Sequence, residues 1–376
     1  VSTINSKNLE NKPVVQLSQA LQGGTTGINV QQTSGLVGGD QASITIRSIA
    51  TVGSAAPLVL VDGVPMDMNN IDPSTVASIS VLKDAASTAL YGARGANGVI
   101  LVTTKRGKAG VIQASYNGYY GLQQPTYWPK FVDAATYMQL ENTKVINGGG
   151  QPVFTQGAID STASRADPVN YPDYNWADYS LRRNLPIQSH SLMVSGGNTT
   201  ARFVINVNHT EEQGQLKQLG PVNQSDYSRT TATINTTVDL SNSFIVYTDI
   251  FASRSDKTEP YINNDGRNTS FFYQSSLYVM PPNVEGQYPQ KPASQLPSYI
   301  KPGTNPYYGN FGQSWNPAQI LQHSGTFKSA RDLVQLNLRP QWTINSKFKL
   351  NGQIGYNVQS GEDITSQQGY TFFNYY

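Results

Sequence analysis

The sequence predicts a mainly β protein in which a small α+β domain is followed by the first strands of a large antiparallel transmembrane β-barrel. Three observations predict this fold class: a composition poor in both charged and apolar residues, long segments in which apolar and polar residues alternate, and connections that are long and short in turn. Alternation with period two gives each strand one apolar and one polar face.

The composition of the 376-residue chain limits the possible classes of protein. Charged residues make up 13% and hydrophobic residues 38%, and both shares are below those of ordinary soluble domains. The 22 tyrosines argue against disorder, because disordered chains combine low hydrophobicity with high charge and few aromatic residues. The composition therefore suits β-structure with one wet and one apolar face.

Several function classes are excluded by what the sequence lacks. Cysteine is absent, which excludes disulfides, thiolate catalysis and cysteine-ligated zinc. The net charge is +2 without a Lys/Arg block, so nucleic-acid binding has no electrostatic basis. The sequence contains no run of about 18 apolar residues, which excludes a transmembrane helix. The chain opens on Val1 without a signal peptide, and we expect a processed or partial chain.

Residues 1–108 are predicted to form the small α+β domain. Short apolar runs alternate there with Gly-rich turns, at 27–30, 44–47, 57–63, 79–82 and 99–102. Before the last run, Asp84 is a good helix N-cap, the alanines that follow favour a helix, and Gly92 is a good stop. The unit is therefore predicted to be strand–helix–strand.

Residues 109–376 are predicted to form the N-terminal portion of the barrel, with about seven strands. Alternation is clearest in 332–344, 348–359 and 244–252 and weaker in 111–121, 188–195, 201–209 and 227–239. In this assignment Leu336 and Ile354 face lipid, while Gln335 and Gln353 face the lumen and tolerate charge better.

The connections favour a barrel over a half-exposed soluble sheet. Segments 122–187, 210–226 and 254–330 are long, and they alternate with tight turns at 196–198, 240–242 and 345–347. Outer-membrane barrels have short periplasmic turns and long outer loops. Phe244, Trp342 and Phe348 flank the tight turns, where an interfacial aromatic girdle belongs.

The number of strands predicts that the chain is incomplete. A lumen that encloses a folded domain needs about 22 strands, so most of the barrel is expected to follow this chain. The terminal run Phe372–Tyr376 is aromatic, but Asn374 breaks its alternation. We interpret it as an internal point of the barrel.

Specific motifs carry a resemblance to a known family. They are Leu21-Gln22-Gly23 with Gly27-Ile28-Asn29-Val30, Pro57-Leu58-Val59-Leu60-Val61-Asp62-Gly63-Val64-Pro65-Met66, Ile79-Ser80-Val81-Leu82-Lys83-Asp84-Ala85, Ala89-Leu90-Tyr91-Gly92-Ala93-Arg94-Gly95-Ala96-Asn97-Gly98-Val99-Ile100 and Thr103-Thr104-Lys105. Together they resemble the plug of the SusC/RagA family of TonB-dependent transporters. The stretches Asp173-Tyr174-Asn175-Trp176, Gln188-Ser189-His190-Ser191-Leu192 and Val194-Ser195-Gly196-Gly197 resemble the family's second-strand region.

The resemblance implies a function, partners and a location. It implies active import of oligosaccharides or oligopeptides across the cell outer membrane of Bacteroidetes-type bacteria, with the barrel in outer-membrane lipid. TonB would pull on the plug, and a SusD-like surface lipoprotein would cover the barrel. Ile46-Arg47-Ser48 departs from the family's Ile-Arg-Gly. The TonB-binding segment is expected upstream of Val1.

Five plug residues are candidate site residues. Asp62-Gly63, between two β-branched stretches, predicts a tight turn, and the alternative is a loop that touches substrate. Arg47 and Arg94 are candidate ion-pair partners for carboxylates of the barrel wall, and the alternative is solvent-exposed arginine. Gly95 and its glycine neighbours follow a predicted helix and lead into a strand, so we interpret them as turn residues with positive φ and not as a dinucleotide fingerprint.

The sequence predicts no enzyme, no metal site and no cofactor. The three histidines, His190, His209 and His323, are far apart without metal-binding spacing, and no nucleophile motif or carboxylate pair stands out. The alternative function is an extracellular glycan-binding β-protein, which would be water-soluble and complete in this chain.

The long 254–330 segment is the candidate binding loop. Aromatic faces stack on sugar rings, and amides hydrogen-bond hydroxyl or peptide groups. The candidate residues for substrate or partner binding are Tyr288, Tyr299, Tyr307, Tyr308, Phe311 and Trp315, and the alternative is packing within the loop. We expect the segment to be extracellular, because a plug at the periplasmic end places the connections after strands one, three and five outside.

Overall fold

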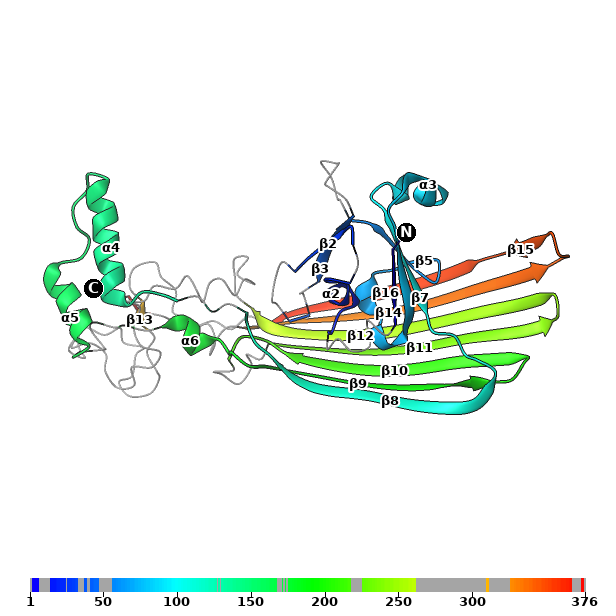
Figure 1. The fold of residues 1–376 in the computed structure, drawn as a ribbon. Helices are drawn as coiled ribbons and strands as arrows, with labels where there is room; N and C mark the ends of the chain where they lie inside the picture. Colours follow the sequence, from blue (N-terminus) through cyan, green and yellow to red (C-terminus); the bar gives the residue numbers. More distant parts are fainter. Residues whose placement is uncertain are drawn as a thin grey trace.

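The computed structural model describes residues 2–6, 14–24, 26–32, 37–38, 41–46, 56–126, 128, 130–167, 171, 173, 175–217, 225–261, 309–310, 325–366 and 373–374. An eight-stranded antiparallel sheet, called the wall below, carries a smaller sheet with short helices, called the plug, over one face (Figure 1). In this part of the chain no helix is both long and apolar enough to cross a membrane.

The wall follows chain order from edge to edge. Its strands are β8 (Gly110–Gln123), β9 (Leu185–Gly197), β10 (Ala201–Gln213), β11 (Asp226–Ser241), β12 (Phe244–Tyr261), β14 (Gly325–Thr343), β15 (Lys349–Asn351) and β16 (Ile354–Ser366). All seven predicted alternating segments are strands, and the last is interrupted at Gly352–Gln353 to give β15 and β16. A separate short pair consists of β13 (Gly309–Asn310) and β17 (Phe373–Asn374).

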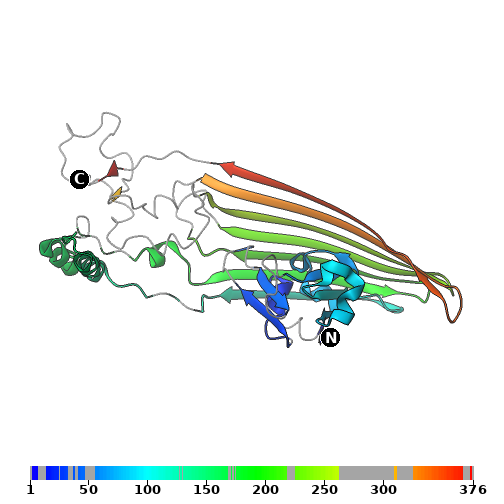
Figure 2. The ribbon, with the colours of Figure 1, turned by 90° about the horizontal axis from the view of Figure 1, so that it is seen from above.

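The short turns lie at one end of the wall and the long connections at the other (Figures 1 and 2). Three helices stand beyond the long-connection end: α4 (Ala134–Asn147), α5 (Gln156–Ser164) and α6 (Trp176–Ser180). They were not predicted, although each begins at a capping residue. Asp133 accepts the Thr136 N–H at 2.7 Å, Thr155 accepts the Ala158 N–H at 3.3 Å, and Asn175 caps α6.

The predicted alternation of faces in the wall is confirmed. Leu336 is 42% exposed on the outward face, and its neighbour Gln335 is 5% exposed on the inward face. Ile354 faces outward, and Gln353 donates to Asn337 Oδ1 on the inner face at 3.1 Å. Gln335, however, is buried under the plug. The expectation that a charge is tolerated there is therefore wrong, because that charge would lose its water.

Strands β12 and β14 are longer than predicted. They pair without a break from Phe244 opposite Trp342 to Tyr261 opposite Gly325, so the predicted 254–330 connection begins and ends inside strands. Outward positions beyond Ala252 and Val334 are mostly polar or charged, and the exceptions are Pro260 and Ala330. Apolar alternation ends there, while backbone pairing continues, which explains the wrong boundaries.

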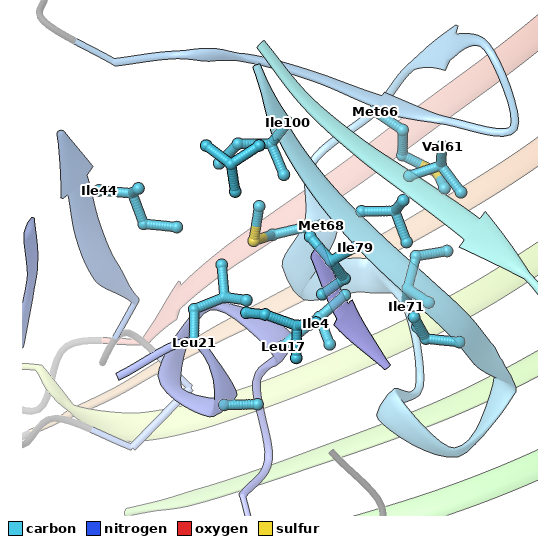
Figure 3. Close-up of a cluster of buried hydrophobic side chains, with 14 of the residues drawn as sticks. Ile4, Leu17, Leu21, Ile44, Val61, Met66, Met68, Ile71, Ile79 and Ile100 are labelled. Carbon is cyan, nitrogen blue, oxygen red and sulfur yellow. The ribbon is translucent and has the colours of Figure 1, made fainter. Parts of the chain in front are cut away.

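The plug is built on a mixed five-stranded sheet in the order β1 (Ser2–Asn5), β6 (Val76–Leu82), β7 (Val99–Thr104), β4 (Leu58–Val61) and β5 (Val64–Pro65). A separate hairpin, β2 (Ile28–Gln32) and β3 (Ala42–Ile46), and the short helices α2 (Leu17–Ala20), η1 (Met68–Asn70) and η2 (Pro73–Thr75) complete it. Figure 3 shows Ile4, Leu17, Ile79 and Ile100 converging in its core.

The predicted plug helix is shorter and less regular than expected. It consists of one turn, α3 (Ala85–Thr88), followed by a 3₁₀ segment, η3 (Ala89–Gly95), which is kinked where Gly92 has φ 57°. Asp84 occupies the N-cap position, but its side chain makes no capping hydrogen bond. Leu90 is 89% exposed, so little apolar surface is buried to stabilise a longer helix.

Candidate functional site

The two-residue turn Asp62-Gly63 joins β4 to β5 at the wall. Val61 and Val64 pair across it, and Asp62 and Gly63 have positive φ angles of 48° and 88°, as a type I′ hairpin turn requires. The Asp62 carboxylate accepts the Thr104 N–H at 3.2 Å and the Thr104 hydroxyl at 2.5 Å. These bonds fix the orientation of the carboxylate.

A charged network links this turn to the wall. Arg106, just after β7, lies 3.2 Å from Asp62 Oδ2 and donates to Asp249 Oδ1. Asp249 Oδ2 accepts hydrogen bonds from Arg339 at 3.0 Å and Asn337 at 3.1 Å. Asn337 also donates to the Asp62 carbonyl at 3.3 Å. Two carboxylates and two guanidinium groups thus balance each other between plug and wall.

Strand register aligns the wall residues of this network. Asp249 on β12 lies opposite Asn235 on β11 and opposite Asn337 on β14. The Asn235 amide donates to Thr104 Oγ1 at 2.9 Å and to the Lys105 carbonyl at 3.1 Å. Period-two placement therefore brings polar groups from three strands to one edge of the plug.

Arg106 is partly buried and remains charged. Burial acts to lower the pKa of Arg106, but its hydrogen bond to Asp249 and the charges of Asp62 and Asp249 outweigh burial and raise the pKa. Because an arginine is already protonated at every ordinary pH, titration of Arg106 does not weaken this contact.

An apolar contact accompanies the charged network. Phe251 on β12 and Leu333 on β14 are 5% and 6% exposed. They belong to the same buried cluster as Val61, Met66 and Ile71 of the plug. We call the combined contact the anchor; its residues are Asp62, Arg106, Asp249, Phe251, Leu333, Asn337 and Arg339.

A second contact, which we call the seam, lies between the plug and strands β9–β11. Its wall side consists of small neutral polar residues, none more than 8% exposed: Ser189, Ser191, Asn206, Asn208, Thr210 and Thr231. Several of them bond to one another within the wall. Asn206 donates to Ser191 Oγ at 2.8 Å, and Asn208 donates to Ser189 Oγ at 3.0 Å.

The plug side of the seam makes few hydrogen bonds to the wall. Asp72 Oδ2 accepts the hydroxyl of Ser74 at 2.5 Å and that of Ser191 at 3.1 Å. Arg229 on β11 donates to the carbonyls of Asn69 and Val15, the latter at 2.6 Å. Arg229 is 3% exposed, and among the described residues it forms no ion pair with a carboxylate.

A polar cavity of about 40 Å³ lies in the seam. It is lined by Val14, Val15, Asp72, Pro73, Ser74, Asn117, Tyr119, Ser189, Ser191, Asn208, Thr210 and Arg229. A cavity of this size and polarity accommodates one or two water molecules. In the described part of the chain, no cluster of three or more His, Asp or Glu residues is arranged to hold a metal ion.

Comparison with known proteins finds a matching domain model and relatives of this chain. A model of the TonB-dependent receptor plug domain matches residues 1–99. The TonB-dependent receptor P3 of Formosa agariphila is 31% identical over 401 residues, covering 99% of this chain and 36% of the relative. The TonB-dependent receptor SusC of Bacteroides thetaiotaomicron is 26% identical, covering 57% of this chain and 20% of SusC.

The solved structures agree in fold. The RagAB peptide importer in its closed-closed state superposes with a TM-score of 0.74 at 21% identity, covering 98% of this chain and 41% of that chain. The chain belongs to the SusC/RagA-like TonB-dependent transporters. It spans between 20% and 36% of the length of the curated relatives it matches.

The predicted site residues of this SusC/RagA-like chain lie in different surroundings. Asp62-Gly63 forms the predicted tight turn and also lies against the wall. Arg94 is exposed and pairs with no described carboxylate; its ion pair with the barrel wall stays a prediction. Gly95 is buried, and a Cβ there would approach the Thr88 carbonyl to 2.8 Å. Gly95 is therefore needed for close packing and not for positive φ.

The other predicted residues lie outside the described part of the chain. They are Arg47 and the loop residues Tyr288, Tyr299, Tyr307, Tyr308, Phe311 and Trp315. The structure also brings together residues of this SusC/RagA-like chain that sequence reasoning missed, above all Arg106 and Arg229. The sequence did contain a signal for Asp249, because a carboxylate on the polar face of a predicted strand indicates a contact on the inner side of the sheet.

Proposed function

We propose that this chain forms the plug, residues 1–108, and the first wall strands, residues 109–376, of an outer-membrane transporter that imports oligosaccharides or oligopeptides with energy from TonB. The observation that carries the proposal is a folded domain pressed against the polar face of a sheet whose opposite face is apolar. In this proposal the plug obstructs the lumen until it is pulled, and the chain catalyses no reaction.

The outward face supports a membrane location. One register row crosses the wall through Tyr116, Leu192, Val207, Ala232, Ala252, Val334 and Val358. Outward apolar residues of β14 run from Trp342 to Val334, about 27 Å along the strand at 3.4 Å per residue. A tilt of about 40° shortens this to about 20 Å, close to the apolar band of outer-membrane barrels.

The polarity changes abruptly at the next row toward the long connections. That row contains Gly118, His190, His209, Thr230, Arg254, Asp332 and Ser360. A water-soluble glycan-binding protein has no reason to expose a band of Leu, Val and Ile bounded by such a row. The outward face therefore favours the transporter over the alternative.

The orientation, partners and location are part of the same proposal. The connections that carry α4–α6 and the 262–324 segment are proposed to be extracellular and to meet substrate or a SusD-like lipoprotein. TonB is proposed to act through a segment upstream of Val1. Arg47 remains a prediction for an ion pair with a carboxylate of the barrel wall, and the six aromatic residues of the loop remain predictions for contact with substrate or partner.

Uptake measurements in the native host test the proposal. Strains lacking this gene, or lacking TonB, should both lose growth on the same carbon source, whether a polysaccharide digest or a peptide digest. A strain with Leu336→Arg should show less protein in the outer membrane, because a charge at the lipid-facing midplane costs about 2–4 kcal/mol. Growth of the gene deletion at the wild-type rate on every digest that needs TonB would reject the proposal.

A further inference from the structure

We infer that the seam between the plug and strands β9–β11 opens first and admits a neutral, hydrogen-bonding chain, while the anchor on β12 and β14 stays closed. Arg229 is the residue that keeps the seam shut. This inference rests on the proposed function, because it assumes that the plug moves while the wall stays in place.

The wall side of the seam loses little when the plug leaves. Its side chains already bond within the wall: Ser189 Oγ lies 3.0 Å from Thr210 Oγ1, and Thr210 donates to Asn208 Oδ1 at 3.0 Å. These bonds survive removal of the plug. Apart from Arg229, which is charged and 3% exposed, the wall groups of the seam are neutral, and water can bond them without a large desolvation term to overcome.

The seam is also incompletely paired in the closed state. Asn206 Oδ1, Thr231 Oγ1 and Arg229 Nε are buried and have no hydrogen-bond partner, and the same is true of Arg106 Nη2 and Arg339 Nε at the anchor. Arg229 lines the polar cavity, which is about twice the volume of the cavity of about 20 Å³ beside the anchor. A buried polar atom without a partner costs free energy, and this cost is recovered when the seam opens to solvent.

The rim of the seam toward the long connections is closed by a small contact. Val15 and Val37 of the plug pack with Ile187 and Tyr227 of the wall. Arg229 donates a hydrogen bond to the Val15 carbonyl. This apolar cluster is much smaller than the plug core that Phe251 and Leu333 join at the anchor. The rim is therefore the weaker of the two apolar contacts.

Chain order favours release of the rim at Val15 before the anchor, whereas the seam residues Asn69, Asp72 and Ser74 follow Asp62 in the chain. A pull from the N-terminal side first reaches β1, which pairs with β6 through the four residues Ser2–Asn5. The next wall contact along the described chain is Val15 with Arg229. Asp62 and Arg106 of the anchor come much later in the chain, so force reaches them only after the rim has been strained.

The opened seam fits a neutral chain rich in hydroxyl or amide groups. Beside the charged Asp72 and Arg229, its lining offers the hydroxyls of Ser189, Ser191 and Thr210 and the amides of Asn117 and Asn208. Such groups both donate and accept hydrogen bonds. Oligosaccharides and neutral peptides share this chemistry, and the two arms of the test separate them.

The test uses the complete transporter, purified and inserted in a planar bilayer, with urea to loosen the plug. The chain has no cysteine, so engineered pairs are unambiguous. Ser74→Cys with Ser191→Cys crosses the seam, where the two hydroxyls lie 3.0 Å apart. Val64→Cys with Gly355→Cys is the matched pair beside the anchor, where a Cβ on Gly355 would lie 3.6 Å from Val64.

The expected result is that the oxidised seam pair abolishes K⁺ conductance at urea concentrations that open the wild type, and that dithiothreitol restores it. The oxidised pair beside the anchor should conduct like the wild type. Maltoheptaose in one arm and a neutral Gly/Ser heptapeptide in the other should each reduce the open conductance. If only one of these probes reduces the conductance, the ligand belongs to the class of that probe, an oligosaccharide or a neutral peptide. If neither probe reduces it, the assignment of a neutral hydrogen-bonding chain is overturned.

Arg229→Gln provides a measurement without a disulfide. It should open at a lower urea concentration than the wild type, by roughly half of the midpoint, whereas the outward-facing control Arg254→Gln should open at the wild-type midpoint. The inference is overturned if the oxidised pair beside the anchor abolishes the conductance while the oxidised seam pair leaves it unchanged. It is also overturned if both oxidised pairs reduce the conductance equally. Neither result depends on TonB or on cellular uptake, so failure here is distinct from failure of the proposed function.

Discussion

The anchor and the seam are two contacts between the same plug and the same wall, and they differ in chemistry. At the anchor, Asp249 is shared by two guanidinium groups, and Phe251 enters the plug core. At the seam, small hydroxyl and amide side chains bond largely to one another. At the anchor, removing the plug would separate Arg106 from Asp249 and expose the apolar surface of Phe251 and Leu333. At the seam it would expose mainly neutral polar groups, together with the charged Arg229 and the small apolar rim of the wall.

This difference shows how one interface can be firm on one side and weak on the other. Buried charges and apolar groups lose much free energy when separated from their partners. Neutral polar groups exchange protein partners for water at little net cost. The inner face of the wall can therefore encode the direction in which the plug moves.

Asp249→Ala should give the largest effect. Arg106 and Arg339 would lose their shared carboxylate, and loss of one partner from a buried ion pair costs about 3–5 kcal/mol. The measurement is the urea midpoint of plug release, followed by maleimide labelling of a cysteine at Ala20 in the plug core. Thr231→Ala in the seam should cost about 1 kcal/mol or less, because the Thr231 hydroxyl is buried without a hydrogen-bond partner. Equal shifts for the two variants would break the comparison.

Phe251→Ala should come next. Truncation of a buried aromatic side chain in an apolar cluster costs about 3 kcal/mol. Thr233 lies directly opposite Phe251 on β11 and provides the control, because Thr233→Ala should cost about 1 kcal/mol or less. The same labelling assay applies. If Thr233→Ala releases the plug as readily as Phe251→Ala, the apolar part of the anchor contributes nothing.

Gly63→Ala should have an intermediate effect. Its φ of 88° is unfavourable for a residue with a Cβ, and the Cβ would approach the Gln353 amide to 3.1 Å, so we expect a loss of about 1–2 kcal/mol. Gly355→Ala is the control, because its Cβ would make ordinary contact with Val64 at 3.6 Å. A urea midpoint that Gly63→Ala leaves unchanged would show that the turn is not needed for the anchor.

Substitution of Asp133 should have the smallest effect on release of the plug. The hydrogen bonds that its carboxylate accepts from Thr136 lower the pKa of Asp133. Its contribution to α4 is therefore present above the unfolded pKa of about 3.9 and is lost as pH falls through the lower folded value. Asp133→Ala should cost α4 about 1 kcal/mol, seen as faster amide hydrogen exchange in that helix.

Asp133→Asn is the matched control for this last change. Asparagine caps a helix about as well as aspartate, but its amide does not titrate, so α4 should keep its protection at low pH. Neither variant should move the urea midpoint of plug release, because α4 lies beyond the end of the wall (Figure 1). A shift of that midpoint would mean that the outer helices support the plug.

Sequence reasoning succeeded where a local pattern has one structural solution. The dipeptide Asp62-Gly63 between two β-branched stretches predicted a tight turn, and the structure has it, with positive φ at both residues. It failed at the ends of β12 and β14, where outward positions become polar while backbone pairing continues. It also missed α4, because a helix with few buried residues leaves no strong apolar period in the sequence.

The sequence by itself determined the strands of the wall, the apolar and polar faces of those strands and the tight turns. These features depend on neighbours one to four residues apart, so composition and alternation record them, and the plug motifs carried the resemblance to the family. Only the tertiary structure decided that Arg106 and Asp249 meet, that Arg229 grips the Val15 carbonyl and that Gln335 is covered. Those contacts join residues far apart in the chain, and their partners are chosen by strand register and by where the plug rests on the wall.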